Sequence, residues 1–250
     1  MLLLAFDTAT PAVTVALHDG RRVLAEIVTV DARRHGELLA PSIAKVIADA
    51  GAEPGDLTAV AAGVGPGPYT GLRVGVVSAR VFARTLGIPV YGVCTLDVIA
   101  RPARPVAAGR EFIVVTDARR KELYWARYAA YGTRAAGPDV NRPAEITDGA
   151  TLPVAGQAAT LYPDDLGEPI WREHPSAAVL AELVAERLSW PDGRDGRIGA
   201  GVAGVAGVVN GIDRAEAAEE AGVDLLPPEP LYLRRPDARV PGPPKRVTAP

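Results

Sequence analysis

The chain has 250 residues, of which 48% are hydrophobic and 23% are charged, and its formal net charge is -3. These values fit a globular protein with one large or two small domains, and the total charge does not indicate a nucleic-acid or membrane binder. Cys94 is the only cysteine, which excludes an internal disulfide, a C-x-x-C motif and a multi-cysteine metal site.

The N-terminus and the longest uncharged runs bear on location. The apolar stretch before Asp7 lacks a basic region and is too short for a signal peptide. The uncharged runs 57–72 and 198–212 are short and glycine-rich, so neither is expected to span a membrane. A single cysteine also suits a reducing compartment. We therefore expect a cytoplasmic protein with no membrane partner.

The first hundred residues predict the order β-β-β-α-β-α-β, which is typical of an α/β domain with a mixed sheet. Pro41 is expected to kink or split the first helix, and Gly87 is expected to end the second. Strands are expected at 2–7, 12–17, 23–30, 57–64 and 90–93, and helices at 36–50 and 70–86.

A repeat of this pattern begins after residues 101–109, which combine proline, glycine and arginine and are expected to form a linker. FIVVTDARRKELYWARY mirrors LLLAFDTATPAVTVAL in element order, and Asp117 corresponds to Asp7. The sequence therefore predicts two related lobes.

The rest of the chain is less regular. A strand is expected at 152–156 and a helix at 176–188 with Ser176 as its N-cap, whereas 194–209 receives no assignment. Residues 236–250 are expected to form a flexible basic tail, for which simple solvation and contact with RNA are the alternatives. The predicted division is 1–104 for the N-terminal lobe, 105–225 for a smaller second lobe and 226–250 for a proline-rich, largely flexible segment.

The glycine-rich stretch GVGPGPYTGLRVG, residues 63–75, lies between a predicted strand and a predicted helix. Backbone N–H groups at such a helix start favour an anion. The stretch lacks the lysine of a nucleotide P-loop, however, and Pro66 and Pro68 remove two N–H donors. A structural turn and an anion site both remain open.

The helix after this loop is apolar on more than one side. One stripe includes Leu72, Val76 and Ala79, and a row of small residues consists of Gly71, Gly75 and Ala79. A helix of this kind is either buried on two sides or packs against a partner. The pattern does not decide between the two.

Candidate ligand-binding residues are few. Asp7, Thr8 and Asp117 lie at strand ends beside turns, where carboxylates either hold a metal-bound nucleotide or cap the turn. The three histidines have no metal-ligand spacing, and no nucleophile motif is present. We therefore name no catalytic residue and no metal site.

Several motifs together resemble the TsaB family of tRNA threonylcarbamoyladenosine biosynthesis proteins. The GPG-x-x-TGLR-x-G block is the most specific, although Pro68-Tyr69 stands where members commonly carry Ser-Phe. The matching stretches are LLLAFDTATPAVTVAL, RRHGELLAPSI, AAGVGPGPYTGLRVGVVSAR, GIPVYGVCTLDVIA, VTDARRKELYWARY, VAGQA and PLYLRR. The resemblance implies an α/β fold of two duplicated actin-like, ribonuclease-H-like lobes, each a mixed sheet with helices.

The resemblance also implies a catalytic paralogue, TsaD, which transfers threonylcarbamoyl to the adenosine next to the anticodon. TsaD carries a metal-binding H-x-x-x-H motif, and Thr95 and Ile99 occupy the corresponding positions here. The implied function is therefore a non-catalytic subunit that binds and stabilises TsaD. No resident cofactor is expected, and weak nucleotide binding stays open.

The implied partner surface consists of the helices 36–50 and 70–86. Its expected residues are Leu39, Ile43, Val46, Gly71, Leu72, Gly75, Val76 and Ala79. The expected partners are TsaD in a heterodimer, the ATPase TsaE in the larger complex, tRNA through that complex, and a second copy when TsaD is missing. An ATP-dependent phosphotransferase of the sugar-kinase type is the alternative function, and a stand-alone peptidase is a weaker one.

Overall fold

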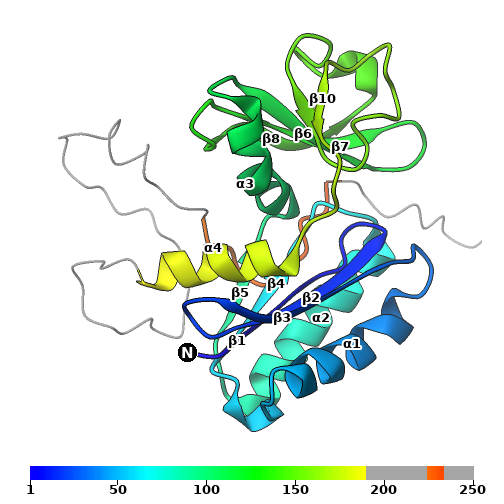
Figure 1. Ribbon diagram of the computed structural model, residues 1–250. Coiled ribbons are helices and arrows are strands. Elements are labelled where there is room, and N and C mark those ends of the chain that lie inside the picture. The colour runs from blue at the N-terminus through cyan, green and yellow to red at the C-terminus, as the bar shows by residue number, and fades with distance from the viewer. Residues whose placement is uncertain (190–223, 234–250) are drawn as a thin grey trace, which may run out of the picture.

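The first five strands form one mixed sheet in the computed structural model, which describes residues 1–189 and 224–233 (Figure 1). Its order is β3-β2-β1-β4-β5. Strands β1 to β3 are antiparallel neighbours, and β4 and β5 continue the sheet in parallel with β1. The strands are β1 Leu3–Asp7, β2 Ala12–His18, β3 Val23–Val30, β4 Ala59–Gly63 and β5 Val90–Val93.

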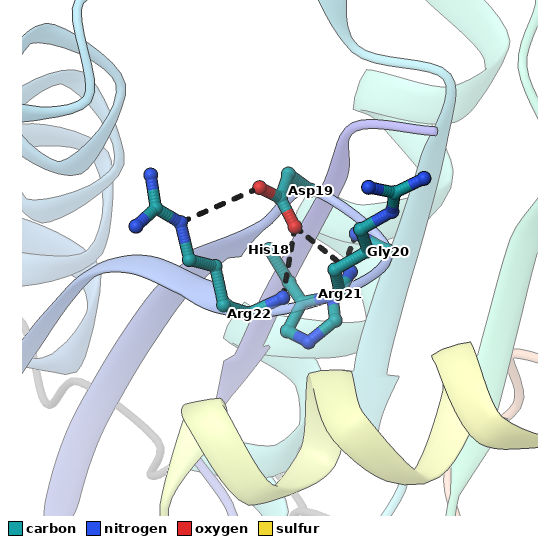
Figure 2. Close-up of polar contacts among 5 residues, drawn as sticks. All are labelled: His18, Asp19, Gly20, Arg21 and Arg22. Carbon is teal, nitrogen blue, oxygen red and sulfur yellow. Dashed lines mark hydrogen bonds and ion pairs between the residues drawn. The ribbon is translucent and has the colours of Figure 1, made fainter.

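The turn between β2 and β3 illustrates how polar side chains close these short connections (Figure 2). Asp19 Oδ1 accepts hydrogen bonds from the backbone N–H groups of Arg21 and Arg22, both at 2.8 Å. Gly20 has a φ of 93°, a left-handed conformation that a side chain would disfavour. The three strands expected within the first thirty residues are confirmed, and they pair as an antiparallel meander.

The second sheet repeats the topology of the first. Its order, taken from the opposite edge, is β8-β7-β6-β9-β10, with antiparallel pairs on one side of β6 and parallel pairs on the other. Each of its strands thus corresponds to one in the first sheet, which confirms the predicted duplication. The strands are β6 Phe112–Asp117, β7 Leu123–Tyr128, β8 Arg134–Asn141, β9 Val154–Ala155 and β10 Pro169–Trp171.

Helices cover both faces of the first sheet, so its central strands are buried on both faces. Leu4 and Phe6 of β1 pack toward α1 (His35–Asp49) and α2 (Tyr69–Leu86), whereas Leu3 and Ala5 pack toward α4 (Ala177–Ser189). Figure 1 shows α1 and α2 on one side of this sheet and α4 on the other. The α/β fold class with two mixed sheets is confirmed.

The predicted boundaries of α1 and α2 hold to within one residue. Helix α1 runs through Pro41 as a single helix, so the expected split does not occur. Gly87 follows α2 with a φ of 67° and acts as its left-handed C-cap, as expected. Two 3-10 turns, Pro54–Asp56 and Pro143–Glu145, complete the short connections.

The predicted linker at 101–109 is wrong, because most of it belongs to helix α3, Thr95–Ala107. Pro102 and Pro105 lie inside this helix. Its apolar side, which includes Ile99, Ala103 and Ala107, packs on the second sheet. This burial outweighs the low helix propensity that proline confers.

The lobe division remains a prediction, and two segments depart from it. Helix α4 falls within 105–225 but packs on the first sheet, because its buried leucines complete that sheet's second face. Residues 226–233 fall within the segment expected to be largely flexible, yet their backbone forms hydrogen bonds with Gly92 of β5 and with Val64, which follows β4. The predictions for 194–209 and 236–250 lie outside the described residues.

Candidate functional site

The glycine-rich loop packs tightly on the turn between β1 and β2. A Cβ at Gly63 would collide with the Asp7 carboxylate, and one at Gly67 would collide with the Ala9 carbonyl. A Cβ at Gly71 would lie 2.6 Å from the carbonyl oxygen of Thr8. The glycines therefore allow a close approach of backbone to backbone. This packing accounts for the glycines without an anion.

Asp7 is fully buried at the end of β1, and its carboxylate is already satisfied by protein groups. Oδ1 accepts a hydrogen bond from the Ala9 N–H at 2.7 Å, and Oδ2 accepts one from Thr95 Oγ1, also at 2.7 Å. Burial raises the pKa of Asp7, although the hydrogen bonds from Ala9 and Thr95 oppose the shift. Asp7 thus ties β1 to the start of α3.

The raised pKa of Asp7 predicts how stability depends on pH. A carboxyl whose pKa is higher in the folded than in the unfolded chain stabilises the fold below its unfolded pKa. That stability is lost as pH rises through the folded pKa. We expect the free energy of unfolding of Asp7→Asn, relative to wild type, to increase between pH 4 and pH 7. Urea unfolding at several pH values measures this difference, and a decrease over that range would contradict the assigned direction.

Thr8 and Asp117 line one cavity of about 280 Å³, whereas Asp7 does not reach it. Residues at the starts of α1 and α2 form two of its walls, and Arg33 and Arg119 also line it. Asp117 accepts a hydrogen bond from the Arg119 N–H at 2.8 Å and forms an ion pair with its guanidinium at 3.5 Å. The structure thus brings two of the three candidate ligand residues together.

The two positions that correspond to the TsaD metal motif are buried and engaged in packing. Thr95 donates to Asp7 and accepts a hydrogen bond from the Gly65 N–H at 3.2 Å, and Ile99, on the same helix α3, packs against the second sheet. Within residues 1–189 and 224–233, no group of three or more His, Cys, Asp or Glu side chains could hold a metal ion. Burial raises the pKa of the nearby Cys94 thiol to about 12, which opposes formation of a thiolate nucleophile.

The side chains expected at the partner interface are instead buried in the chain's own core. Gly71 and Gly75 of the small-residue row face Thr8, which donates a hydrogen bond from Oγ1 to the Gly71 carbonyl at 2.7 Å. All eight residues are buried in this chain, so they do not form an accessible surface here, and their part in a partner interface stays a prediction. The eight are Leu39, Ile43, Val46, Gly71, Leu72, Gly75, Val76 and Ala79.

The accessible face of α2 consists of different residues. Tyr69, Arg73, Val77 and Val81 are exposed and follow one another at intervals of four, so they form one row along the helix. Val77 is 48% exposed and Val81 is 56% exposed. The exposed Val77 and Val81 account for the second apolar side that the sequence of this helix indicates.

Sequence reasoning missed a polar cluster that joins α3 to the second sheet. Tyr128 of β7 donates a hydrogen bond to Asp97 Oδ1 at 2.7 Å, and Arg134 of β8 lies 3.7 Å from Asp97 Oδ2. Asp97 and Tyr128 are buried, and burial raises the pKa of Asp97. Asp97, Tyr128 and Arg134 are not spaced at a helix or strand period, so no local sequence pattern predicts the cluster.

Comparisons with known proteins identify relatives over most of the chain. The family described as "TsaD: tRNA N6-adenosine threonylcarbamoyltransferase" matches residues 22–164, which is more than half of the chain. An uncharacterized protein of Mycobacterium tuberculosis is 42% identical over 95% of this chain and 93% of its own length. The tRNA threonylcarbamoyladenosine biosynthesis protein TsaB of Escherichia coli is 35% identical over 51% of this chain and 55% of its own length.

A solved structure titled "YeaZ from Pseudomonas aeruginosa" is also similar. It is 28% identical with a TM-score of 0.64, over 74% of this chain and 91% of that chain. This likeness extends beyond the half of the chain that aligns with the Escherichia coli protein. Among the helices of the described residues, none combines the length and the hydropathy that crossing a membrane requires.

Proposed function

Because the chain belongs to the TsaB family, we propose that it takes part in the synthesis of threonylcarbamoyladenosine in tRNA. Its role there is that of a non-catalytic subunit, which binds and stabilises a TsaD-type catalytic paralogue. The family match supports the pathway, and the residues at the metal-motif positions support the non-catalytic role. A role in tRNA modification supports a cytoplasmic location, and the chain would meet TsaE and tRNA through the complex.

The observation that best supports the non-catalytic role is that Thr95 donates a hydrogen bond to the buried Asp7. A family paralogue that handles a metal needs imidazole or carboxylate ligands that face the reacting group. Thr95 here points to a buried carboxylate and joins two elements of the core. Exchanging Thr95 and Ile99 for histidines would bury two imidazoles with no open position for substrate.

The alternative function, an ATP-dependent phosphotransferase, would need the cavity lined by Thr8 and Asp117 to hold a nucleotide. Asp7 does not line this cavity. The cavity volume of about 280 Å³ is slightly smaller than that of typical small-molecule sites, roughly 300–1,000 Å³. We therefore propose that no resident cofactor is required. Titration of the isolated chain with Mg-ATP separates the two functions, since tight binding would favour the phosphotransferase.

Reconstitution of the tRNA modification tests the proposed function. Purified TsaD, TsaE, the adenylate-forming enzyme, ATP, threonine, bicarbonate and tRNA are combined with and without this chain. We expect modified adenosine only when the chain is present, and no product from the chain without TsaD. Equal product yield in both mixtures would overturn the proposal.

A further inference from the structure

Residues 224–233 return to the first sheet and lie across its last strand. Leu226 and Gly92 of β5 exchange backbone hydrogen bonds of 2.8 Å and 2.7 Å, and the Leu231 N–H donates to the Val64 carbonyl at 2.8 Å. We call residues 224–233 the strap. Its backbone is held at both ends, so its path over the glycine-rich loop is defined.

Side-chain packing fixes the strap between the two lobes. Leu226 and Leu231 pack against the cluster formed by Val64, Leu72 and their neighbours, and also against the cluster under α3. A Cβ at Gly92 would lie 2.7 Å from the Pro227 carbonyl oxygen, so glycine is needed for this close approach. The strap is therefore an integral part of the fold.

The strap ends on the exposed face of α2. The ring of Tyr232 stacks on that of Tyr69 with centroids 5.2 Å apart, and Arg73 lies 5.1 Å from the Tyr69 ring centroid. Both tyrosines remain exposed, at 44% and 45%. Tyr232 thus lengthens the row of Tyr69, Arg73, Val77 and Val81 beyond the start of the helix.

The charge of this face indicates the chemistry of the partner surface that would bind it. Helix α2 carries three arginines, all exposed, and has no acidic residue, although the whole chain has a net charge of -3. Exposed aromatic side chains beside arginine are the residues most enriched at the centres of protein interfaces. A matching protein surface would present apolar side chains and carboxylates.

We propose that the strap completes the partner-binding face of α2, with Tyr232 as one of its contact residues. The partner is a protein surface that offers apolar side chains and carboxylates, and under the proposed function it belongs to TsaD. This inference rests on the proposed function, and it adds that a segment more than 130 residues beyond α2 contributes to the same surface. Partner binding therefore depends on the strap as well as on the helix.

Full-length Tyr232→Ala, Tyr232→Phe and Tyr131→Ala test this inference by titration calorimetry with purified TsaD from the same organism. Tyr131 is the matched control, because it is 41% exposed on the turn between β7 and β8, away from α2. We expect Tyr232→Ala to weaken binding at least about tenfold, as removal of an interface aromatic does. Tyr232→Phe keeps the ring, so it and Tyr131→Ala should bind within about twofold of wild type.

Wild-type-like affinity of Tyr232→Ala would overturn the inference while leaving the proposed function intact. Equal loss in Tyr232→Ala and Tyr131→Ala would also overturn it, since the effect would then not belong to the strap. Failure of the wild-type chain to bind TsaD would instead overturn the proposed function. Thermal unfolding of each variant identifies any loss that arises from misfolding.

Discussion

Gly71→Ala should destabilise the fold by about 3 kcal/mol or more, although alanine favours a helix more than glycine does. The new Cβ would lie 2.6 Å from the carbonyl oxygen of Thr8, a backbone atom that cannot rotate away. Relief would require α2 to move off the β1–β2 turn and would disturb the hydrogen bond from Thr8 Oγ1 to the Gly71 carbonyl. Urea unfolding followed by circular dichroism measures the change.

Gly36→Ala is the matched control for this prediction. Gly36 lies in the first turn of α1, and a Cβ there would meet nothing within 4 Å. The same substitution should therefore be neutral or stabilise by up to about 1 kcal/mol through helix propensity. If Gly71→Ala behaved like Gly36→Ala, close packing would not be the reason for glycine in the loop.

Val77→Asp should weaken binding to TsaD at least about tenfold while the isolated chain stays folded. Val77 is 48% exposed at the middle of the row on α2, so aspartate remains solvated in the free protein. In the complex the same carboxylate would be buried within the interface, where an unpaired charge is costly. Titration calorimetry with purified TsaD measures the affinity.

Val106→Asp on α3 controls for the charge change, because Val106 is similarly exposed at 44%. It lies outside α1 and α2, so affinity should stay within about twofold of wild type. Undiminished binding by Val77→Asp would exclude the exposed face of α2 as the TsaD contact. Circular dichroism of both variants confirms that any loss of binding occurs in a folded chain.

The buried residues of α2 show why helical periodicity alone cannot locate a partner interface. Leu72, Val76 and Ala79 form a stripe at helical spacing, and periodicity shows that such a stripe is covered. Periodicity does not show whether the stripe packs on the chain's own sheet or on another protein. The position of Thr8 against Gly75 decides this, and it depends on a contact between segments about 65 residues apart.

Local signals were sufficient for most of the first lobe. Apolar runs that end in Asp7 and Asp117 predicted β1 and β6, because a strand buried on both faces reads as a continuous hydrophobic run. Strand β8, Arg134–Asn141, was not predicted, since its glycine and proline are typical of turns. Backbone pairing with β7 stabilises β8 as a strand, although its own residues have low strand propensity.

Residues close along the chain therefore determined the strands of the first sheet, helices α1 and α2, and the duplication, because their periods and end signals are local. Tertiary structure alone decided that Asp7 accepts a hydrogen bond from Thr95, that α3 continues through two prolines, and that Tyr232 stacks on Tyr69. The contacts of Asp7 with Thr95 and of Tyr69 with Tyr232 each span more than 80 residues, and α3 packs on a sheet that forms later in the chain. Burial and hydrogen bonding between such distant segments leave no periodic trace in the sequence.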